Sequence, residues 1–263
     1  MAQSSLSRRD LHVLEKMKDP EANPMAAVMV DTNLPKDPNV TDISVYERVS
    51  QKEREIVLAI QQLEMELAGL RPSTSTEPTN DYRRCVDDLG RLISGNPRYA
   101  SARNNRAQAL RRLYGDTMIL PGQLDRKALV SNANEDEISQ AALTTLSDLD
   151  EAISLLTPKI SFVPISPVTG NTLSQAHTQR AAIYYMTSKS IRSDVTICLG
   201  GRKEEKWTKL DFESAASRDF ALGGRYGNEI AKALAVSTNP TAKLCGQIVR
   251  EAMKKEYGPA FAQ

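Results

Sequence analysis

The stretch DYRRCVDDLGRLISGNP at residues 81–97, followed by ASARNNRAQALRR at residues 100–112, decides the fold of this chain. The first part places its apolar residues on one helical stripe, formed by Tyr82, Cys85, Leu89, Leu92 and Ile93. Gly95 and Pro97 then supply a helix stop signal. The second part is rich in alanine, arginine, glutamine and leucine, which are strong helix formers. The stretch therefore predicts two helices joined by a short turn.

A related spacing recurs further along the chain. A small residue precedes a large apolar residue by four positions, and another small or apolar residue follows three positions later. The three sets are Cys85, Leu89 and Leu92; Thr145, Leu149 and Ala152; and Thr208, Phe212 and Ala215. Small residues let two crossing helices approach, while the large residue fills the space beside them. The spacing predicts three stacked helix pairs, although other alanine-rich antiparallel helices produce such matches by chance.

The segment at 100–112 resembles the most recognisable part of the tetratricopeptide repeat protein 36 family, in which an asparagine pair precedes Arg-Ala-Gln-Ala. Further similar segments follow in order, namely DLDEAI at 148–153, DFESAA at 211–216 and NPTAKLC at 239–245. The short N-terminal segment DLHVLEKMKDP also resembles the family. The chain looks like a fungal-type member with extended loops, and Arg103 stands where an aromatic residue is usual.

The repeat spacing and the resemblance together imply an all-α tetratricopeptide-repeat α-solenoid of about three helix pairs. A C-terminal helix at 241–257 is expected to cap the last pair. We expect the repeat domain to span residues 43–263, after an N-terminal region at 1–42 that holds a short helix at 10–19 and a linker of low order. Insertion loops are expected near 117–136, 159–171 and 189–206.

The composition limits the kinds of partner. Lysine and arginine number 34 against 33 acidic residues, so a net charge of +1 gives no overall field to hold nucleic acid or an acidic membrane. No segment approaches the roughly 18 consecutive apolar residues of a membrane span. Cys85, Cys198 and Cys245 lack the spacing of a zinc site or a disulfide framework. We expect a cytoplasmic or nucleocytoplasmic protein.

The sequence shows no recognisable catalytic apparatus. The two histidines, His12 and His177, lie far apart, and we expect His177 to pack in the core. The segment GGRK at 200–203 is glycine-rich but lacks the spacing of a phosphate-binding loop. We therefore expect no enzymatic activity, no cofactor and no metal, although residues distant in sequence can still form a hidden active site.

The resemblance implies a non-enzymatic adaptor, with a seventy-kilodalton-class heat-shock chaperone or a client enzyme as partner and a link to tyrosine catabolism. In such repeats the first helices line a concave groove, and their polar residues are the candidate partner contacts. These candidates are Asn104, Asn105, Gln108, Arg111, Arg112, Gln175, Gln179 and Tyr185. Amides can hydrogen-bond the backbone of a peptide, and arginines favour carboxylates. A solvated polar face is an equally good interpretation of each single residue.

Two alternatives are weighed against this groove. Chaperone-binding repeats grip a C-terminal carboxylate with lysines and asparagines. Asn105 fits one such position. At the other clamp positions the alignment places Ala59 and Leu63 on the first helix and neutral glutamines on the third, so this clamp is predicted to be absent.

The second alternative is nucleic-acid binding by the Arg103–Arg112 cluster, formed by Arg103, Arg106, Arg111 and Arg112. The near-zero net charge and the lack of interleaved aromatic residues do not favour it.

Overall fold

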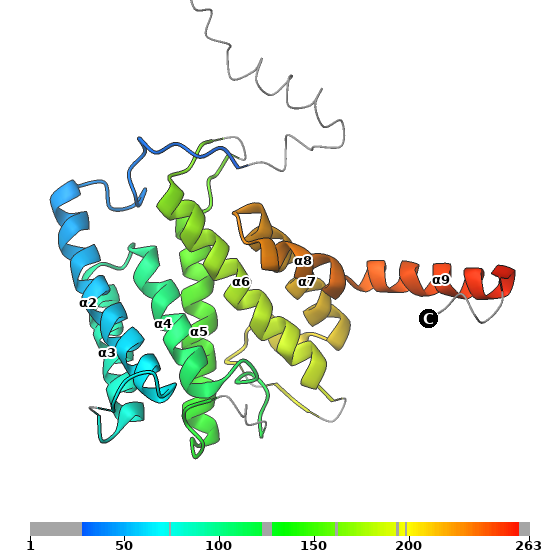
Figure 1. Cartoon of the computed structure of the whole chain (residues 1–263), viewed down its shortest axis with the longest axis horizontal. Coiled ribbons are helices and arrows are strands. Elements are labelled where there is room, and N and C mark those ends of the chain that lie inside the picture. The colour runs from blue at the N-terminus through cyan, green and yellow to red at the C-terminus, as the bar shows by residue number, and fades with distance from the viewer. Residues whose placement is uncertain are drawn as a thin grey trace, which may run out of the picture.

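A computed structural model describes residues 28–73, 75–122, 128–160, 163–192, 195–197 and 199–257. These residues form eight α-helices and one 3₁₀ helix, with a single isolated β-bridge and no strand (Figure 1). The α-helices are α2 (Ile43–Leu67), α3 (Pro78–Gly95), α4 (Ala100–Tyr114), α5 (Glu135–Leu156), α6 (Pro167–Ser190), α7 (Lys209–Arg225), α8 (Glu229–Thr238) and α9 (Pro240–Tyr257). The 3₁₀ helix η1 spans Lys203–Lys206. The predicted all-α class is confirmed.

Consecutive helices pack against one another in chain order from α2 to α8. The pairs α2–α3, α4–α5 and α6–α7 are antiparallel and lie side by side (Figure 1). Helix α4 also contacts both α2 and α6, so the first helices of the three pairs share one side of the molecule. This arrangement brings together residues that lie more than 100 positions apart in the sequence.

The second helix of each pair carries the core residue that the spacing predicted. Leu89 on α3, Leu149 on α5 and Phe212 on α7 are each 0% exposed. Burying such a side chain contributes about 1.5–3 kcal/mol to folding. Leu149 and Phe212 belong to the largest apolar cluster, while Leu89 belongs to a smaller one between α2, α3 and α4. The predicted core stripe is thus confirmed at all three positions.

Two helix boundaries differ from those predicted. Helix α6 begins at Pro167, inside the expected loop at 159–171, because the Ser166 hydroxyl caps it by accepting from Thr169 N and proline fits the first turn of a helix. The glycine pair Gly223 and Gly224 predicts a break in the helix, but both residues lie within α7. A Cβ atom on Gly223 would lie 2.5 Å from Thr178 Oγ1, so glycine serves close packing of α7 on α6.

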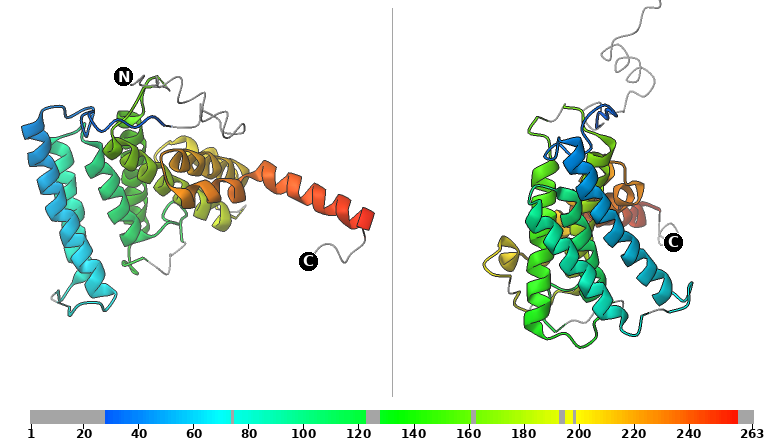
Figure 2. Two further views of the ribbon diagram at one scale, coloured as in Figure 1. Left: turned by 45° about the horizontal axis from the view of Figure 1, so that its top comes forward. Right: turned by 90° about the vertical axis from the view of Figure 1, so that its left-hand side faces the viewer.

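Residues 28–42 form a strap that crosses the ends of α4, α5 and α6 (Figure 2). Asp31 N donates to Ile165 O at 2.9 Å and Ile165 N donates to Met29 O at 2.9 Å. The Asn39 amide donates to Leu155 O at 2.9 Å. Residues 28–42 are thus held against the helices, and the prediction of low order for this part of the linker is wrong. The expected helix at 10–19 lies outside the described residues.

The C-terminal helices do not follow the predicted capping arrangement. Helix α8 packs along α7 and covers the last pair, whereas α9 projects away from the body (Figures 1 and 2). The prediction that residues 241–257 cap the last pair is therefore wrong, since a shorter helix takes that place. None of the helices in the described residues has the combination of length and apolar character that spanning a membrane requires.

Candidate partner-binding groove

Helices α2, α4 and α6 line an open groove of about 1290 Å³, which we call the α2–α4–α6 groove. Its apolar part is formed by Val57, Ile60, Met65 and Ala109. Its amide-bearing side chains are Gln61, Asn105, Gln108 and Gln175. On α2 and α4 these residues recur at three- and four-residue steps, which places each set on one helix face. The groove thus offers apolar contact together with hydrogen-bond donors and acceptors.

Charges line one side of the groove as ion pairs. Arg112 Nε lies 2.8 Å from Glu64 Oε1, and Arg111 Nε lies 2.7 Å from Asp116 Oδ1. No lysine is among the groove-lining residues that the structure describes. A ligand carboxylate would therefore have to compete with Glu64 and Asp116 for the two guanidinium groups.

Asn105 joins the groove to a buried carboxylate on α2. Its Nδ2 donates to Glu53 Oε1 at 2.8 Å, and the Tyr99 hydroxyl donates to the other carboxylate oxygen. Burial raises the pKa of Glu53 above its ordinary value, and the hydrogen bonds from Tyr99 and Asn105 only partly oppose this effect. The amide of Asn105 is therefore held in place by α2.

Five of the eight predicted contact residues line the groove, namely Asn105, Gln108, Arg111, Arg112 and Gln175. Gln108 and Gln175 are exposed, so their amides are accessible to a ligand. These predicted contacts from α4 and α6 therefore share one surface.

Asn104 and Gln179 face inward, and the prediction that they face outward is wrong. They are 1% and 7% exposed. Gln179 Nε2 donates to Asn104 Oδ1 at 2.8 Å, and Asn104 Nδ2 donates to Gln175 Oε1 at 2.9 Å. These amides satisfy one another between α4 and α6, so their role is to join the two helices.

Tyr185 lies apart from the groove. Its ring packs edge-on against Phe220 of α7, with centroids 6.3 Å apart, and Lys189 Nζ lies 5.2 Å from the centroid of the Tyr185 ring. The structure does not bring it together with the other predicted contacts.

The contribution of α2 was missed by the sequence analysis. Ala59 and Leu63 were aligned with ligand-binding positions, but Leu63 is buried in the core and Ala59 lines a different surface, beside Cys85. Val57 and Gln61 face the groove instead. Val57 directly follows Ile56 and Gln61 directly follows Ile60, both of which pack against the apolar core, so a rotation of about 100° per residue would have indicated them.

The Arg103–Arg112 cluster is divided between two sides of α4. Arg103 and Arg106 both bind Asp148 of α5, at 3.1 and 2.6 Å, whereas Arg111 and Arg112 lie at the groove. The Asp148 carboxylate is 2% exposed, so the first two arginines neutralise a buried charge. The four guanidinium groups do not form a single basic patch for phosphates.

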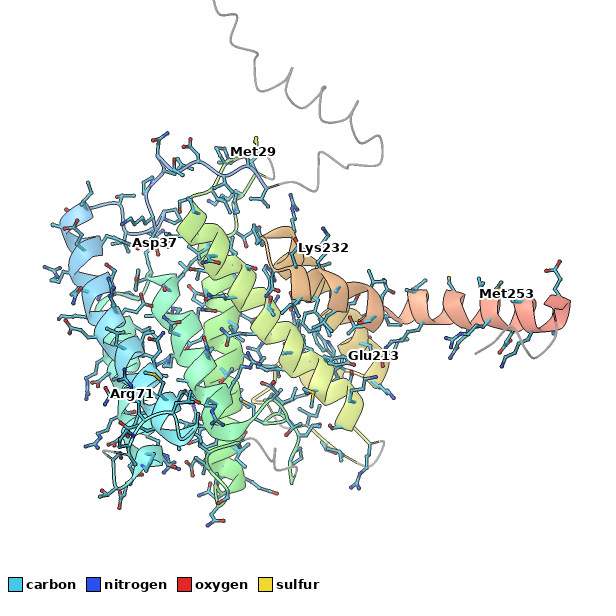
Figure 3. All side chains as sticks on the ribbon, in the orientation of Figure 1. Met29, Asp37, Arg71, Glu213, Lys232 and Met253 are labelled. Atoms are coloured by element: carbon cyan, nitrogen blue, oxygen red, sulfur yellow. The ribbon has the colours of Figure 1, made fainter. Side chains whose placement is uncertain are left out.

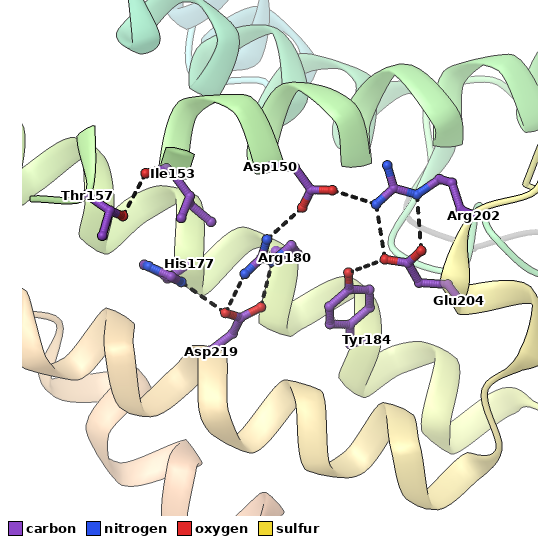
Figure 4. Close-up of polar contacts among 9 residues, drawn as sticks. All are labelled: Asp150, Ile153, Thr157, His177, Arg180, Tyr184, Arg202, Glu204 and Asp219. Atoms are coloured by element: carbon purple, nitrogen blue, oxygen red, sulfur yellow. Dashed lines mark hydrogen bonds and ion pairs between the residues drawn. The ribbon is translucent and has the colours of Figure 1, made fainter. Parts of the chain in front are cut away.

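A second polar network connects α5, α6, α7 and η1 (Figure 4). Arg180 binds Asp219 and Asp150, while Arg202 binds Asp150 and Glu204. The Tyr184 hydroxyl donates to Glu204 at 2.7 Å. Three carboxylates and two guanidinium groups thus fix the loop before α7 against α5 and α6.

His177 belongs to this network and lies in the core, as predicted. It is 4% exposed, its Nδ1 lies 2.9 Å from Asp219 Oδ1, and its ring stacks on Tyr226. Burial alone would raise the pKa of Asp219, but the hydrogen bonds from Arg180 and His177 outweigh burial and lower it. Within the described ranges, no three metal-ligating side chains gather closely enough to hold an ion.

Comparison with known proteins identifies relatives along nearly the whole chain. It is 36% identical over 257 residues to the L-tyrosine degradation gene cluster protein hmgX of Aspergillus fumigatus. The matched region covers 96% of this chain and 93% of that protein. It is also 28% identical over 200 residues to tetratricopeptide repeat protein 36 of Danio rerio. This second match covers 76% of this chain and 73% of that protein. The chain belongs to the tetratricopeptide repeat protein 36 family.

Membership of the tetratricopeptide repeat protein 36 family confirms the resemblance carried by residues 100–112. No family model matches the sequence, and no solved structure matches it. Arg103 was noted as a departure from the family pattern. Here its Nη2 donates to Pro97 O at 2.9 Å and its Nη1 lies 3.1 Å from Asp148 Oδ1, so Arg103 ties the α3–α4 turn to α5.

Proposed function

We propose that this chain is a non-enzymatic tetratricopeptide-repeat adaptor that binds a partner polypeptide in the α2–α4–α6 groove. In this proposal α2–α3, α4–α5 and α6–α7 are the three repeats. The observation that supports it is the groove itself, because the first helices of three successive pairs line one continuous groove with a volume of about 1290 Å³.

The dimensions and chemistry of the groove suit an extended segment or one helix. Adjacent packed helices lie about 8–10 Å apart, so three helices span about 20 Å, the length of roughly six extended residues. Val57, Ile60 and Met65 offer apolar contact to a partner side chain. The accessible amides of Gln108 and Gln175 can donate to and accept from a partner backbone. Mixed apolar and amide surfaces of this kind are typical of peptide recognition.

The names of the relatives suggest where the partner acts. One relative is named for an L-tyrosine degradation gene cluster, and we propose that the partner is an enzyme of that degradation. A heat-shock chaperone is the other partner type that the family resemblance implies. Because Arg111 and Arg112 already bind carboxylates, we propose that any chaperone binds elsewhere than through a C-terminal carboxylate in the groove.

A comparison of three forms of the tagged chain tests the proposal. The forms are the native chain, a groove-filling variant Gln108→Trp and a control Glu55→Ala on the opposite side of α2, expressed in cells grown on L-tyrosine. We expect the native chain and the control to retain the same degradation enzyme, and Gln108→Trp to lose it. The enzyme is then purified and its affinity for each form is measured by calorimetry. Equal affinity for all three forms, or no binding, would contradict the proposal.

A further inference from the structure

Helix α9 exposes a continuous apolar face. This face is formed by Leu244, Cys245, Ile248, Val249, Ala252 and Met253, all of which are exposed. Leu244, Ile248 and Val249 are each 56% exposed, which is unusual for large apolar side chains on one stripe. On the opposite edge Lys243 Nζ lies 3.4 Å from Glu213 Oε1 of α7. Figure 3 shows α9 extending past Glu213 to Met253, away from the helical body.

Helix α8 also exposes two large apolar side chains, Ile230 and Val236. It buries Ala231 and Thr238 toward α7. Ile230 and Val236, which point away from that buried side, are 74% and 69% exposed. In a stack of helix pairs the next helix would cover this face. Among the described residues, α8 therefore has exposed apolar side chains that no further helix covers, and α9 has an exposed apolar face that packs on no other helix.

The link between α8 and α9 prevents these faces from meeting within one chain. Only Asn239 separates the two helices. Asn239 N donates to Val236 O, and the Asn239 side chain accepts from Thr241 N at 2.9 Å, so this residue ends one helix and caps the other. Pro240 restricts it to the extended conformation observed, with φ −64° and ψ 118°. Antiparallel helix pairs need a connection of about two to five residues.

We infer that this chain forms a dimer in which α9 of each copy covers α8 of the other. Exchange of one element between two copies gives a closed two-fold arrangement, and each copy supplies the face that its partner lacks. Helix α9 has 18 residues and is about 27 Å long. Two such helices meeting two α8 faces give an interface that can approach the roughly 1,200–2,000 Å² of specific complexes. This inference does not depend on the function proposed for the groove.

The oligomeric state of the full chain tests the inference. Sedimentation equilibrium at micromolar concentration should give twice the chain mass of 29.0 kDa. The double variant Ile248→Glu/Val249→Glu and the single variant Ile230→Glu should each weaken dimerisation by about 100-fold or more, because a charge would enter an apolar interface. Leu58→Glu is the matched control, since Leu58 on α2 is 53% exposed, and it should leave the mass unchanged.

A longer link distinguishes exchange from other contacts. Insertion of Gly-Ser-Gly-Ser between Asn239 and Pro240 lets α9 fold back on its own α8, so we expect a monomer with α9 amides protected from hydrogen exchange. A monomeric native chain would overturn the inference. This outcome includes a monomer in which residues 1–27 cover α9. A dimer that persists in both Ile230→Glu and the insertion variant would also overturn it, since α9 would then pair with α9. Binding of the native chain to anionic vesicles with loss of the dimer would assign the face to lipid instead.

Discussion

Arg180 of α6 binds both carboxylate oxygens of Asp219 of α7, with Nε 2.7 Å from Oδ2 and Nη2 2.8 Å from Oδ1. Both side chains are largely buried, and Asp150 and His177 complete the set of contacts (Figure 4). A paired arrangement of this kind fixes the distance and rotation between two helices. The α6–α7 pair is therefore held by a buried ionic contact as well as by apolar packing.

Asp219→Ala should destabilise the protein by about 3–5 kcal/mol, because it leaves a buried guanidinium without its main counter-charge. Urea unfolding followed by circular dichroism measures this change. Arg218→Ala, at an exposed neighbouring position on α7, is the control and should change the free energy of unfolding by less than about 0.5 kcal/mol. A loss of similar size in both variants would show that the α6–α7 contact is not specific to this ion pair.

Glu53 should make stability depend on pH in the opposite sense to a salt-bridged carboxylate. Burial raises its pKa in the folded state above the unfolded value of about 4.3. The folded state therefore binds the proton more tightly, and the contribution to stability is lost as pH rises through the folded pKa. We expect this contribution to be larger at about pH 5 than at pH 7, and Glu53→Gln to flatten the curve over that interval.

Asp37 has a raised pKa from burial and acts in the same direction, so Glu53→Gln should remove only part of the slope. Asp219, whose pKa is lowered, contributes stability that is present above about pH 4 and is lost as pH falls further. Unfolding measured at several pH values separates the two effects. A curve for Glu53→Gln that matches the native protein would contradict the assignment to Glu53.

Asn104→Ala should act on stability and Gln108→Ala on binding. Asn104 is buried, and its removal leaves Gln179 and Gln175 with fewer partners, which costs about 1–3 kcal/mol. Gln108 is exposed in the groove, so its removal should leave the free energy of unfolding within about 0.5 kcal/mol of the native value. Thermal unfolding measures the stability of the two variants, and calorimetry with the degradation enzyme proposed as partner measures their binding. Loss of binding without loss of stability in Asn104→Ala would reverse these roles.

The apolar spacing identified the core because it depends only on which side of a helix a residue lies. Leu89, Leu149 and Phe212 follow this rule and are fully buried. The direction of Asn104 could not be predicted in the same way. Its partners Gln175 and Gln179 lie 71 and 75 positions away, and only folding shows that three amides meet and satisfy one another.

The C-terminal error has a different physical cause. The last pair does have a cover, but it is α8, and the helix pattern in the sequence does not report how long the connection between two helices is. Asn239 is the single residue between α8 and α9. To predict so short a link from the sequence, both helix ends would have to be located to within one residue. Gly224, which was expected to stop α7, instead lies within it where the backbone of α8 approaches at Lys232, and this close contact appears only once α7 and α8 have packed.

Gly224→Ala should destabilise the contact between α7 and α8. A Cβ atom at this position would lie 2.8 Å from Lys232 Cα and 2.9 Å from Lys232 N, so the backbone of α8 would have to move. Such overpacking costs about 1–3 kcal/mol. Gly95→Ala is the control because no neighbouring element lies within 4 Å of the place that its methyl group would take, and alanine favours the helix by up to about 1 kcal/mol. Urea unfolding compares the two variants, and hydrogen exchange of α8 reports whether it detaches. Equal stability of both variants would show that α8 shifts without cost, and that its packing on α7 is looser than the glycine contact requires.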